Sequence, residues 1–503
     1  MATHWVDRTV IVMQNAWILT NSSVIQPAFR RYIMALEASG TVADGSTERW
    51  RDRKRYLWLI GLIVPSFAFI AIGGYELTGW SVFLWTGPIV VLGVVPAIDF
   101  CIGFDPTNPP DDVIEELEND KYYRYVTFAF LPVQYAGFIW AMYLIATGDW
   151  PVIDKVGLAV TLGFIGGIGI NTAHELGHKK ESHERWLSKI ALAQSFYGHF
   201  YIEHNRGHHV RVATPEDPAS SRLGENFYRF WFRTVFGSLR SAWQVEAKRY
   251  RRRNTHPFHI GNDVLNAWLM TIALWAALTI WLGVGILPYL VLQAVVGFSL
   301  LEVVNYLEHY GMLRQQTTSG RYERVLPMHS WNSNNIATNV LLYHLQRHSD
   351  HHANPTRRYQ TLRDYRESPS LPTGYAGMIL LALFPPLWRR VMDHRVVEHF
   401  DGDVRLANVA PGKLDRLTRR FGLPADAVLD ESPLEDTTPG ACDDDVPAAR
   451  CPGCGYTYEV AVGNELEGFA AGTAWKDIPD DWTCPDCGVR EKVDFIPLTE
   501  TSA

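Results

Sequence analysis

Three short clusters of histidine have the spacing of metal ligands. Within each cluster, two imidazole side chains are separated by three or four residues. The clusters consist of His174 and His178; of His204, His208 and His209; and of His348, His351 and His352. Residues three or four apart on a helix share one face, with side chains about 5–6 Å apart, so each cluster can bind a metal ion. Neutral imidazole suits iron, copper, zinc or nickel.

The number of histidines indicates two metal ions, because eight ligands are too many for one. A ninth candidate is His309, in Asn305-Tyr-Leu-Glu-His-Tyr-Gly311, and its spacing alone leaves its role undecided. Soluble diiron bundles use carboxylates together with two Glu-x-x-His motifs. This chain has only one such match among its clusters, from Glu175 to His178, so we expect a histidine-rich dimetal site.

Acidic residues lie close to the histidine clusters in sequence. They are Glu175, Glu203, Glu308 and Asp350. A carboxylate beside a metal-binding histidine commonly accepts a hydrogen bond from the ring nitrogen that does not bind the metal. We take Glu175, Glu308 and Asp350 as candidate catalytic acids acting in this supporting position. The sequence does not decide whether any of them binds the metal directly.

The first histidine cluster also matches a zinc protease motif. His174-Glu-Leu-Gly-His178 fits HExxH, in which the glutamate is the general base of a metalloprotease. An intramembrane zinc protease is therefore one alternative. It leaves the other histidines and the cysteine motif unexplained.

Four of the six cysteines form two Cys-x-x-Cys pairs near the C-terminus. Cys451, Cys454, Cys484 and Cys487 together supply the four thiolates of a tetrahedral zinc or single-iron site. A structural zinc ribbon is the alternative to an iron site. Aromatic residues in and beyond the interval favour a small core around the metal; they are Tyr456, Tyr458, Trp475, Trp482 and Phe495.

Six stretches are long and apolar enough to span a bilayer, which takes about 20 helical residues. They are Leu57–Leu77, Trp80–Ile98, Tyr125–Thr147, Val156–Ala173, Val264–Leu282 and Ile286–Leu307. The basic clusters lie outside the short connections, at Arg49–Arg55, Lys179–Lys180 and Lys248–Arg253. Because Lys and Arg are enriched in cytoplasmic loops, we expect both termini and the histidine clusters to lie on the cytoplasmic side of the membrane.

The chain is therefore expected to be mainly α-helical, with six transmembrane helices and a cytoplasmic helical cap that holds the dimetal site. We divide it into an interfacial segment 1–55, a transmembrane domain 56–409 that carries the dimetal site, a linker 410–448 and a small β-rich domain 449–497. Residues 441–503 carry 13 acidic and four basic residues, whereas the whole chain has a net charge of −8. Such an acidic domain can dock on basic surfaces. Candidates are Lys248–Arg253, Arg347, Arg357 and Arg358.

The C-terminal segment closely resembles rubredoxin. The resemblance covers about 50 residues, from CPGCGYTY through GTAWKDIPDDWTCPDCG to Phe495. It implies one iron held by Cys451, Cys454, Cys484 and Cys487, which carries single electrons.

Residues 55–400 resemble the alkane 1-monooxygenase family, the membrane alkane ω-hydroxylases. The resemblance rests on HELGH, EHNRGHH, QRHSDHH and NYLEHYG. Membrane fatty acid desaturases and hydroxylases share the three histidine clusters, and an enzyme of that kind is the second alternative. NYLEHYG and the rubredoxin-like segment favour the alkane branch. The family resemblance implies that all nine histidines, His309 included, bind two irons.

The same resemblance implies the activity and its partners. The expected reaction converts the terminal methyl group of an n-alkane to a primary alcohol with O2 as co-substrate. Electrons are expected to come from a flavoprotein rubredoxin reductase that uses NAD(P)H, through the fused rubredoxin. The alkane is expected to enter from the bilayer of the bacterial inner membrane, with both termini and the active-site side cytoplasmic. Membrane lipids are expected as partners, and nucleic acid is not.

Overall fold

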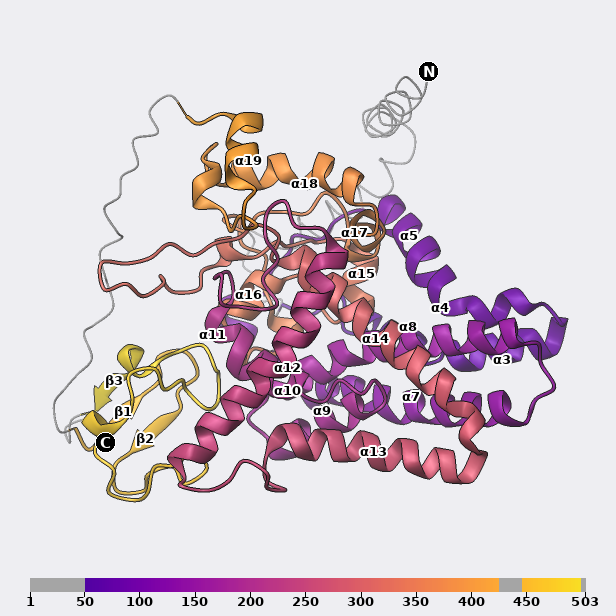
Figure 1. Cartoon of the computed structure of the whole chain (residues 1–503), viewed down its shortest axis with the longest axis horizontal. Coiled ribbons are helices and arrows are strands. Elements are labelled where there is room, and N and C mark those ends of the chain that lie inside the picture. The colour runs from indigo at the N-terminus through magenta and orange to yellow at the C-terminus, as the bar shows by residue number, and fades with distance from the viewer. Residues whose placement is uncertain (1–49, 425–445, 499–503) are drawn as a thin grey trace. The chain divides into compact units, whose positions relative to one another are not determined.

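The computed structural model describes residues 50–424 and 446–498. Among these residues the fold is mainly α-helical, with one small sheet in the C-terminal domain, as predicted (Figure 1). Cys442, the first 49 residues and most of the predicted linker lie outside the described residues.

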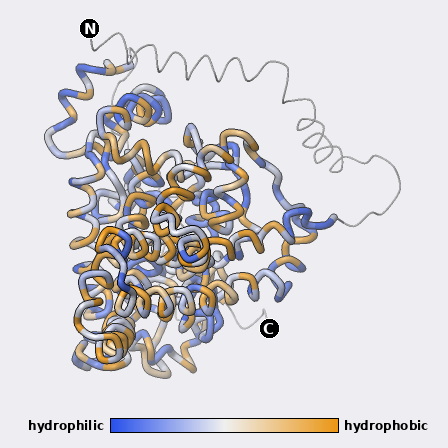
Figure 2. The backbone as a smooth tube through the Cα atoms, turned by 90° about the vertical axis from the view of Figure 1, so that its right-hand side faces the viewer, coloured by the Kyte–Doolittle hydropathy of each residue, from blue (hydrophilic) through white to orange (hydrophobic). Residues whose placement is uncertain are grey.

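Among the described residues, five helical segments are long and apolar enough to cross a membrane, so the chain is an integral membrane protein. They are Ser81–Ile102, α7 (Lys121–Thr147), α8 (Val152–Gly177), α13 (Asp263–Leu282) and the segment Val284–Glu308, which contains α14 (Leu287–Glu308). Apolar residues recur along the chain path in Figure 2. Five of the six predicted spans therefore correspond to continuous apolar segments.

The first predicted span, Leu57–Leu77, is broken instead of continuous. It consists of a 3₁₀ helix, Leu57–Ile63, and α3 (Phe67–Thr78), which meet at an angle of 58°. Pro65 lies at the break, where its missing N–H and its ring interrupt the helical hydrogen bonds. The two pieces count as one span only if the bent pair crosses the membrane together.

The segment Ser81–Ile102 also departs from a regular helix. It runs from a 3₁₀ turn into α4 (Thr86–Ile89), then through a π-helical turn at Val90–Val94 into α5 (Val95–Ile102). Wide turns of this kind occur mostly as single insertions in α-helices, often at functional sites.

Helix α8 is the central helix of the bundle. In its most apolar window 89% of the residues are buried, against 22–44% for the other four segments. Figure 1 shows α7, α8 and α13 running side by side, with α14 crossing them. Glycines allow the close approach of α8 and α14, because a Cβ atom at Gly167 would lie 2.8 Å from the carbonyl oxygen of Gly297.

The remaining helices precede, follow or connect the membrane segments. They are α6 (Ile114–Asn119), α9 (Ser182–Ala193), α10 (Phe200–Glu203), α11 (His209–Arg211), α12 (Phe227–Arg252), α15 (Ile336–Leu341), α16 (His348–Ala353), α17 (Tyr375–Ala382), α18 (Pro385–His399) and α19 (Leu414–Phe421). The histidine clusters lie at the end of α8, in a π-helical turn between α10 and α11 together with α11 itself, and in α16. The helical cap expected from the sequence is present.

The C-terminal domain is built on a three-stranded antiparallel sheet of order β2-β1-β3. Its strands are β1 (Ala448–Arg450), β2 (Thr457–Glu459) and β3 (Ile496–Leu498). So short a sheet is stabilised by the aromatic core packed on it, which contains the residues expected from the sequence. The rings of Trp475 and Phe495 are 5.2 Å apart between centroids, and those of Trp482 and Phe495 are 5.5 Å apart.

We predict that Gly167→Val destabilises the helical domain, because the added isopropyl group would collide with the backbone and side chains of α14. Forcing extra carbon atoms into a packed interior costs about 1–3 kcal/mol. Gly73→Val in α3 is the matched control, since a Cβ atom there has no neighbour within 4 Å. Thermal unfolding in detergent measures the effect. Equal melting temperatures for the two variants would contradict the close packing of α8 and α14.

Candidate metal centre

The first histidine cluster lies where α8 leaves the apolar bundle. His174 occupies the last turn of the helix and His178 is its C-cap residue. Both side chains are buried, and their ring centroids are 4.9 Å apart. The helical spacing predicted from the sequence therefore places both rings on one face.

The second cluster is held by a π-helical turn, His204–His208, between α10 and α11. Because this turn is wider than an α-helical one, His204 pairs with His209, five residues on, with their Nε2 atoms 3.0 Å apart. The neighbouring His208 faces a different set of histidines. The sequence-based expectation that His204 and His208 share one ion is wrong in this respect.

All nine predicted histidines come together in two adjoining groups. The first contains His174, His178, His204, His209 and His351, and the second contains His208, His309, His348 and His352. The third cluster, on α16, thus contributes to both groups, as does the second. His309 follows α14 directly and belongs to the second group, although its spacing did not place it there.

The arrangement of nitrogen atoms suits metal ions. The ligand atoms of each group lie within 4.8 Å of one another. The Nε2 atoms of His174 and His351 are 2.8 Å apart, and those of His348 and His352 are 2.9 Å apart. About 3 Å is the spacing of neighbouring ligands around an ion bound about 2.1 Å from each nitrogen. The Nε2 atoms of His178 and His208 are buried without a hydrogen-bond partner. Two adjacent histidine groups of this kind fit a diiron site.

The four acidic residues near the clusters occupy different positions. The Glu308 Oε2 atom lies 3.2 Å from the Nε2 atom of His348, on the side of the ring where metal would bind. Glu175 instead pairs with Lys179 at 2.9 Å, and Asp350 with Arg357 at 2.8 Å.

Glu203 pairs with Arg211 at 3.0 Å. Of the four, Glu308 is thus the carboxylate beside the histidine rings. The ion pair of Glu175 also leaves the protease interpretation without a free general base.

Asp217 is a supporting carboxylate that the sequence analysis missed. Its Oδ2 atom lies 2.8 Å from the Nδ1 atom of His208 and accepts a hydrogen bond from Ser220. Burial raises the pKa of the Asp217 carboxyl, but His208 and Ser220 lower it more, so the net pKa lies below its ordinary value. The charged carboxylate holds the proton on Nδ1 and leaves Nε2 free for a metal. The only sequence signal was an Asp-Pro turn nine residues after His208.

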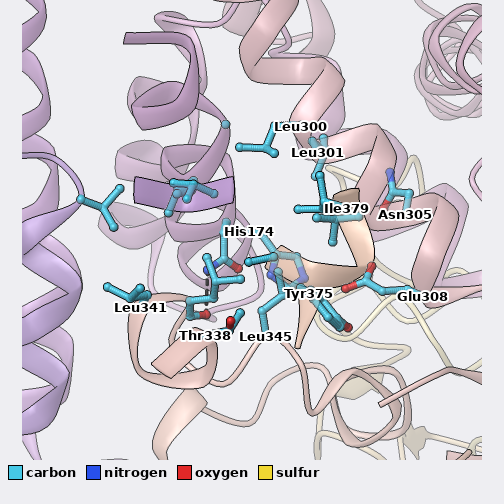
Figure 3. A pocket seen from close by; sticks show the side chains of 18 of the residues that line it. His174, Leu300, Leu301, Asn305, Glu308, Thr338, Leu341, Leu345, Tyr375 and Ile379 are labelled. Carbon is cyan, nitrogen blue, oxygen red and sulfur yellow. Dashed lines mark hydrogen bonds between the residues drawn. The ribbon is translucent and has the colours of Figure 1, made fainter. Parts of the chain in front are cut away.

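Histidines of both groups line an apolar cavity. It has about 810 Å³ of empty volume and is lined by membrane helices and by the loop before α16. In Figure 3, Leu300, Leu301 and Ile379 line one part, and His174, Tyr375 and Glu308 line another. His348 also lines it, so histidines of both groups face the same space.

The four predicted cysteines also come together. The Sγ atoms of Cys451 and Cys487 are 3.7 Å apart, and those of Cys454 and Cys484 are 3.5 Å apart. Such spacings fit a tetrahedral ion with bonds of about 2.3 Å to sulfur. A glycine with positive φ follows each Cys-x-x-Cys pair, Gly455 at 76° and Gly488 at 66°. Their amides hydrogen-bond to the carbonyls of Cys451 and Cys484.

Basic residues of the helical domain contact this cysteine-containing domain. Glu467 is 3% exposed and lies between Arg206, at 2.6 Å, and Arg252, at 2.9 Å. Burial raises the pKa of Glu467, but these two guanidinium groups lower it more, so the net pKa is below its ordinary value. Lys180 donates a hydrogen bond of 2.6 Å to the carbonyl of Cys454.

Only some of the basic residues that were predicted to bind the acidic domain contact it. In the Lys248–Arg253 stretch, Lys248 pairs with Asp481 in addition to the contact of Arg252. Arg347 is buried and donates to backbone carbonyls of the helical domain, while Arg357 and Arg358 pair with acids there. Those three arginines were incorrectly expected at the dock. The sequence analysis missed Lys180 and Arg206.

Comparisons with known proteins agree with both sites. The fatty acid desaturase family matches residues 155–408, and the rubredoxin family matches residues 448–495. The chain is 48% identical to the alkane 1-monooxygenase of Acinetobacter baylyi over 375 residues, which is 74% of this chain and 92% of the relative. It is 44% identical to alkane 1-monooxygenase 1 of Alcanivorax borkumensis over 76% of this chain and 94% of that relative. The alkane 1-monooxygenase of Pseudomonas putida is also 44% identical, over 77% of this chain and 96% of that relative.

We predict that Asp217→Asn weakens iron binding at the histidine site, because the amide cannot replace the charged partner of His208. Loss of such a partner lowers metal affinity or activity roughly 10- to 100-fold. Asp393→Asn is the control, since that buried carboxylate contacts Tyr310 and Arg420 instead of a histidine. Iron analysis after mild chelation checks the prediction, with the rubredoxin absorbance showing that its site is intact. Equal iron retention in the two variants would contradict a positioning role for Asp217.

Proposed function

The chain belongs to the alkane 1-monooxygenase family, and we propose that it hydroxylates the terminal methyl group of n-alkanes to give 1-alkanols. The reaction consumes one alkane, O2, two electrons and two protons, and releases the alcohol and water. The observation that carries the proposal is the apolar cavity that is lined by histidines of both groups.

The walls of the cavity account for the choice of substrate and of carbon. An n-alkane has no polar group to recognise, so a site for it must rely on shape and on removal of apolar surface from water. The walls supply such surface from several helices, among them Phe67, Val95 and Ile168. We propose that a linear chain enters lengthwise, so that only its end reaches His174 and His348. Such a binding mode accounts for attack on the terminal carbon.

We propose that the nine histidines hold two irons, five and four of them respectively, with Glu308 as a further ligand or a proton-holding group beside them. When bound, the irons supply the activation of O2 that a saturated C–H bond requires. The surrounding chain keeps this chemistry away from bulk water, because the nine histidines and Glu308 are all buried. Asp217 orients His208, and Glu308 faces both His348 and the cavity.

The cysteine-containing domain is the proposed electron donor. Pro485, Asp486, Cys487 and Gly488 line a polar cavity together with His178 and Asn205. A cysteine and a histidine of the two proposed metal sites thus border the same small space. This juxtaposition supports electron transfer from the rubredoxin to the histidine site of the same chain. The donor is then the proposed domain 449–497, and the acceptor is the proposed domain 56–409.

A flavoprotein rubredoxin reductase that uses NAD(P)H is the proposed source of these electrons. The C-terminal domain is acidic, so a reductase with a basic surface would dock on it by charge complementarity. We further propose a bacterial inner-membrane location with the metal sites on the cytoplasmic side, where soluble reductants are available. The basic clusters flanking the apolar segments support this orientation.

A desaturase is the second candidate function, because the fatty acid desaturase family matches residues 155–408. Desaturation and hydroxylation begin from the same kind of C–H bond but leave different products. The product therefore discriminates between them.

We predict that membranes containing the protein convert octane to 1-octanol when they receive O2, NAD(P)H and rubredoxin reductase. A linear alkane fits the apolar cavity, whereas a fatty acyl thioester would have to bury polar groups there. Gas chromatography of parallel incubations with octane, a longer alkane and a fatty acyl substrate measures the outcome. An alkene or an unsaturated acyl product without any 1-alkanol would move the enzyme to the desaturases.

We also predict that Gly488→Asn strongly reduces turnover, whereas Gly455→Asn does not. Asparagine tolerates the positive φ that both glycines adopt. A Cβ atom at Gly488 would lie 1.9 Å from the carbonyl oxygen of Asn205, but one at Gly455 has no neighbour within 4 Å. A clash of about 1–3 kcal/mol confined to the docked state corresponds to a roughly 5- to 150-fold weaker dock.

The rate of 1-alkanol formation with rubredoxin reductase as donor measures this effect. Unchanged visible absorbance of the rubredoxin shows that each variant has kept its iron. Full turnover by Gly488→Asn would mean that electrons do not pass through this contact.

A further inference from the structure

We propose that the docking surface formed by Lys180, Arg185, Arg206 and Arg252 binds the rubredoxin domain more tightly when its cysteine site is reduced than when it is oxidised. This inference rests on the proposed electron-transfer function and adds a regulatory property to it. It makes docking of the domain depend on whether the domain carries an electron.

The charge of the cysteine site changes with its redox state. Four thiolates around a ferric ion carry a net charge of −1, and the same thiolates around a ferrous ion carry −2. Any surface with excess positive charge nearby therefore binds the reduced form more strongly.

The docking surface carries such an excess close to the cysteines. Lys180 reaches the backbone of Cys454 itself, and Arg185 and Arg206 line the polar cavity that Cys487 borders. Arg252 is the second partner of Glu467. These four cations face two carboxylates of the domain, Glu467 and Asp486.

Several other charged groups at or beside the contact are paired with an opposite charge. Lys179, which also lines the cavity, pairs with Glu175 at 2.9 Å. Arg324 pairs with Asp494 at 2.8 Å, and Lys248 pairs with Asp481. Lys180, Arg185 and Arg206 therefore bring an excess of positive charge beside Cys454 and Cys487.

Burial keeps this interaction from being screened by salt as completely as a surface pair would be. Cys451, Cys484 and Cys487 are buried, and Glu467 is buried between its two arginines. Charges in such a partly dry contact interact more strongly than exposed ones. The preference for the reduced form should consequently persist at physiological ionic strength and decline as salt is raised.

The dock and the redox state must affect each other equally. If docking is tighter for the reduced form, the docked site is also easier to reduce than the free one. A tenfold difference in docking affinity corresponds to a shift of about 59 mV in the midpoint potential of a one-electron couple. Once the electron has left, the domain binds less tightly and is released more readily.

Release has a function because the edge of the domain that carries the cysteines is covered in the docked state. The backbone at Gly488 approaches Asn205 so closely that no side chain fits between them. A reductase therefore cannot occupy the same edge at the same time. Weaker docking of the oxidised domain frees that edge when it needs another electron.

Potentiometric titration of the full-length, iron-loaded protein in detergent tests the proposal. The visible absorbance of the rubredoxin site reports its midpoint potential. We expect the wild type and Gly455→Asn to have the same potential and Gly488→Asn, whose dock is blocked, to have a lower one. Lys180→Gln should lower the potential by a smaller amount, and Lys121→Gln, at an exposed lysine at the start of α7, should leave it unchanged.

Salt supplies a further measurement that requires no variant. The wild-type potential should fall toward that of Gly488→Asn as ionic strength rises. Equal potentials for the wild type, Gly488→Asn and Lys180→Gln would overturn the redox preference, as would a higher potential in Gly488→Asn. If Gly488→Asn loses turnover in that case, the electron route still stands, so the two proposals fail separately.

Discussion

Buried imidazole nitrogens that face one another are the feature on which the rest of this structure depends. Neutral imidazole has one donor and one acceptor, so two Nε2 atoms 2.8–3.2 Å apart cannot both be satisfied when Nδ1 holds the proton. Burying such unpaired groups costs free energy, and charging them costs more. A metal ion resolves the conflict because it accepts a lone pair from every ring. The fold around the histidines is consequently organised to hold positive metal ions away from water.

Substrate and electrons approach this centre through chemically different surroundings. The cavity lined by Leu300, Ile168 and their neighbours is apolar and is formed largely by membrane helices. The cavity lined by Arg206, Asp486 and His178 is polar and lies against the rubredoxin domain. His174 lines the first space and His178 the second, one helical turn apart at the end of α8. A single helix end thus separates the hydrocarbon from the electron donor.

Residue type and local spacing allowed much of the site to be predicted, whereas long-range contacts could not be. The His174–His178 pair follows from helical periodicity, and the cysteine site from two Cys-x-x-Cys turns. The pairing of His204 with His209 depends on a π-helical turn, which has no reliable signal in residue order. Asp217 reaches His208 through a loop, and Arg206 meets Glu467 across 261 residues of sequence. Pro65 could have indicated the break in the first predicted span. The apolar stretch around it is long enough for one span, however, and was therefore predicted as a continuous helix.

The two π-helical turns show how irregular helices position the site. One, at His204–His208, pairs His204 with His209, five residues on, instead of with His208, the neighbour that a regular α-helix would favour. The other, at Val90–Val94, lies in a membrane segment, and Val91 within it and Val95 just after it line the apolar cavity. Each turn weakens local hydrogen bonding, a cost that is greater where no water can replace the lost bonds. Surrounding packing must therefore hold both turns in place. Helix α12 packs against the turn at His204–His208, and α17 packs against the turn at Val90–Val94. The close contact of α8 with α14 in turn fixes the helix ends from which His174 and His309 project.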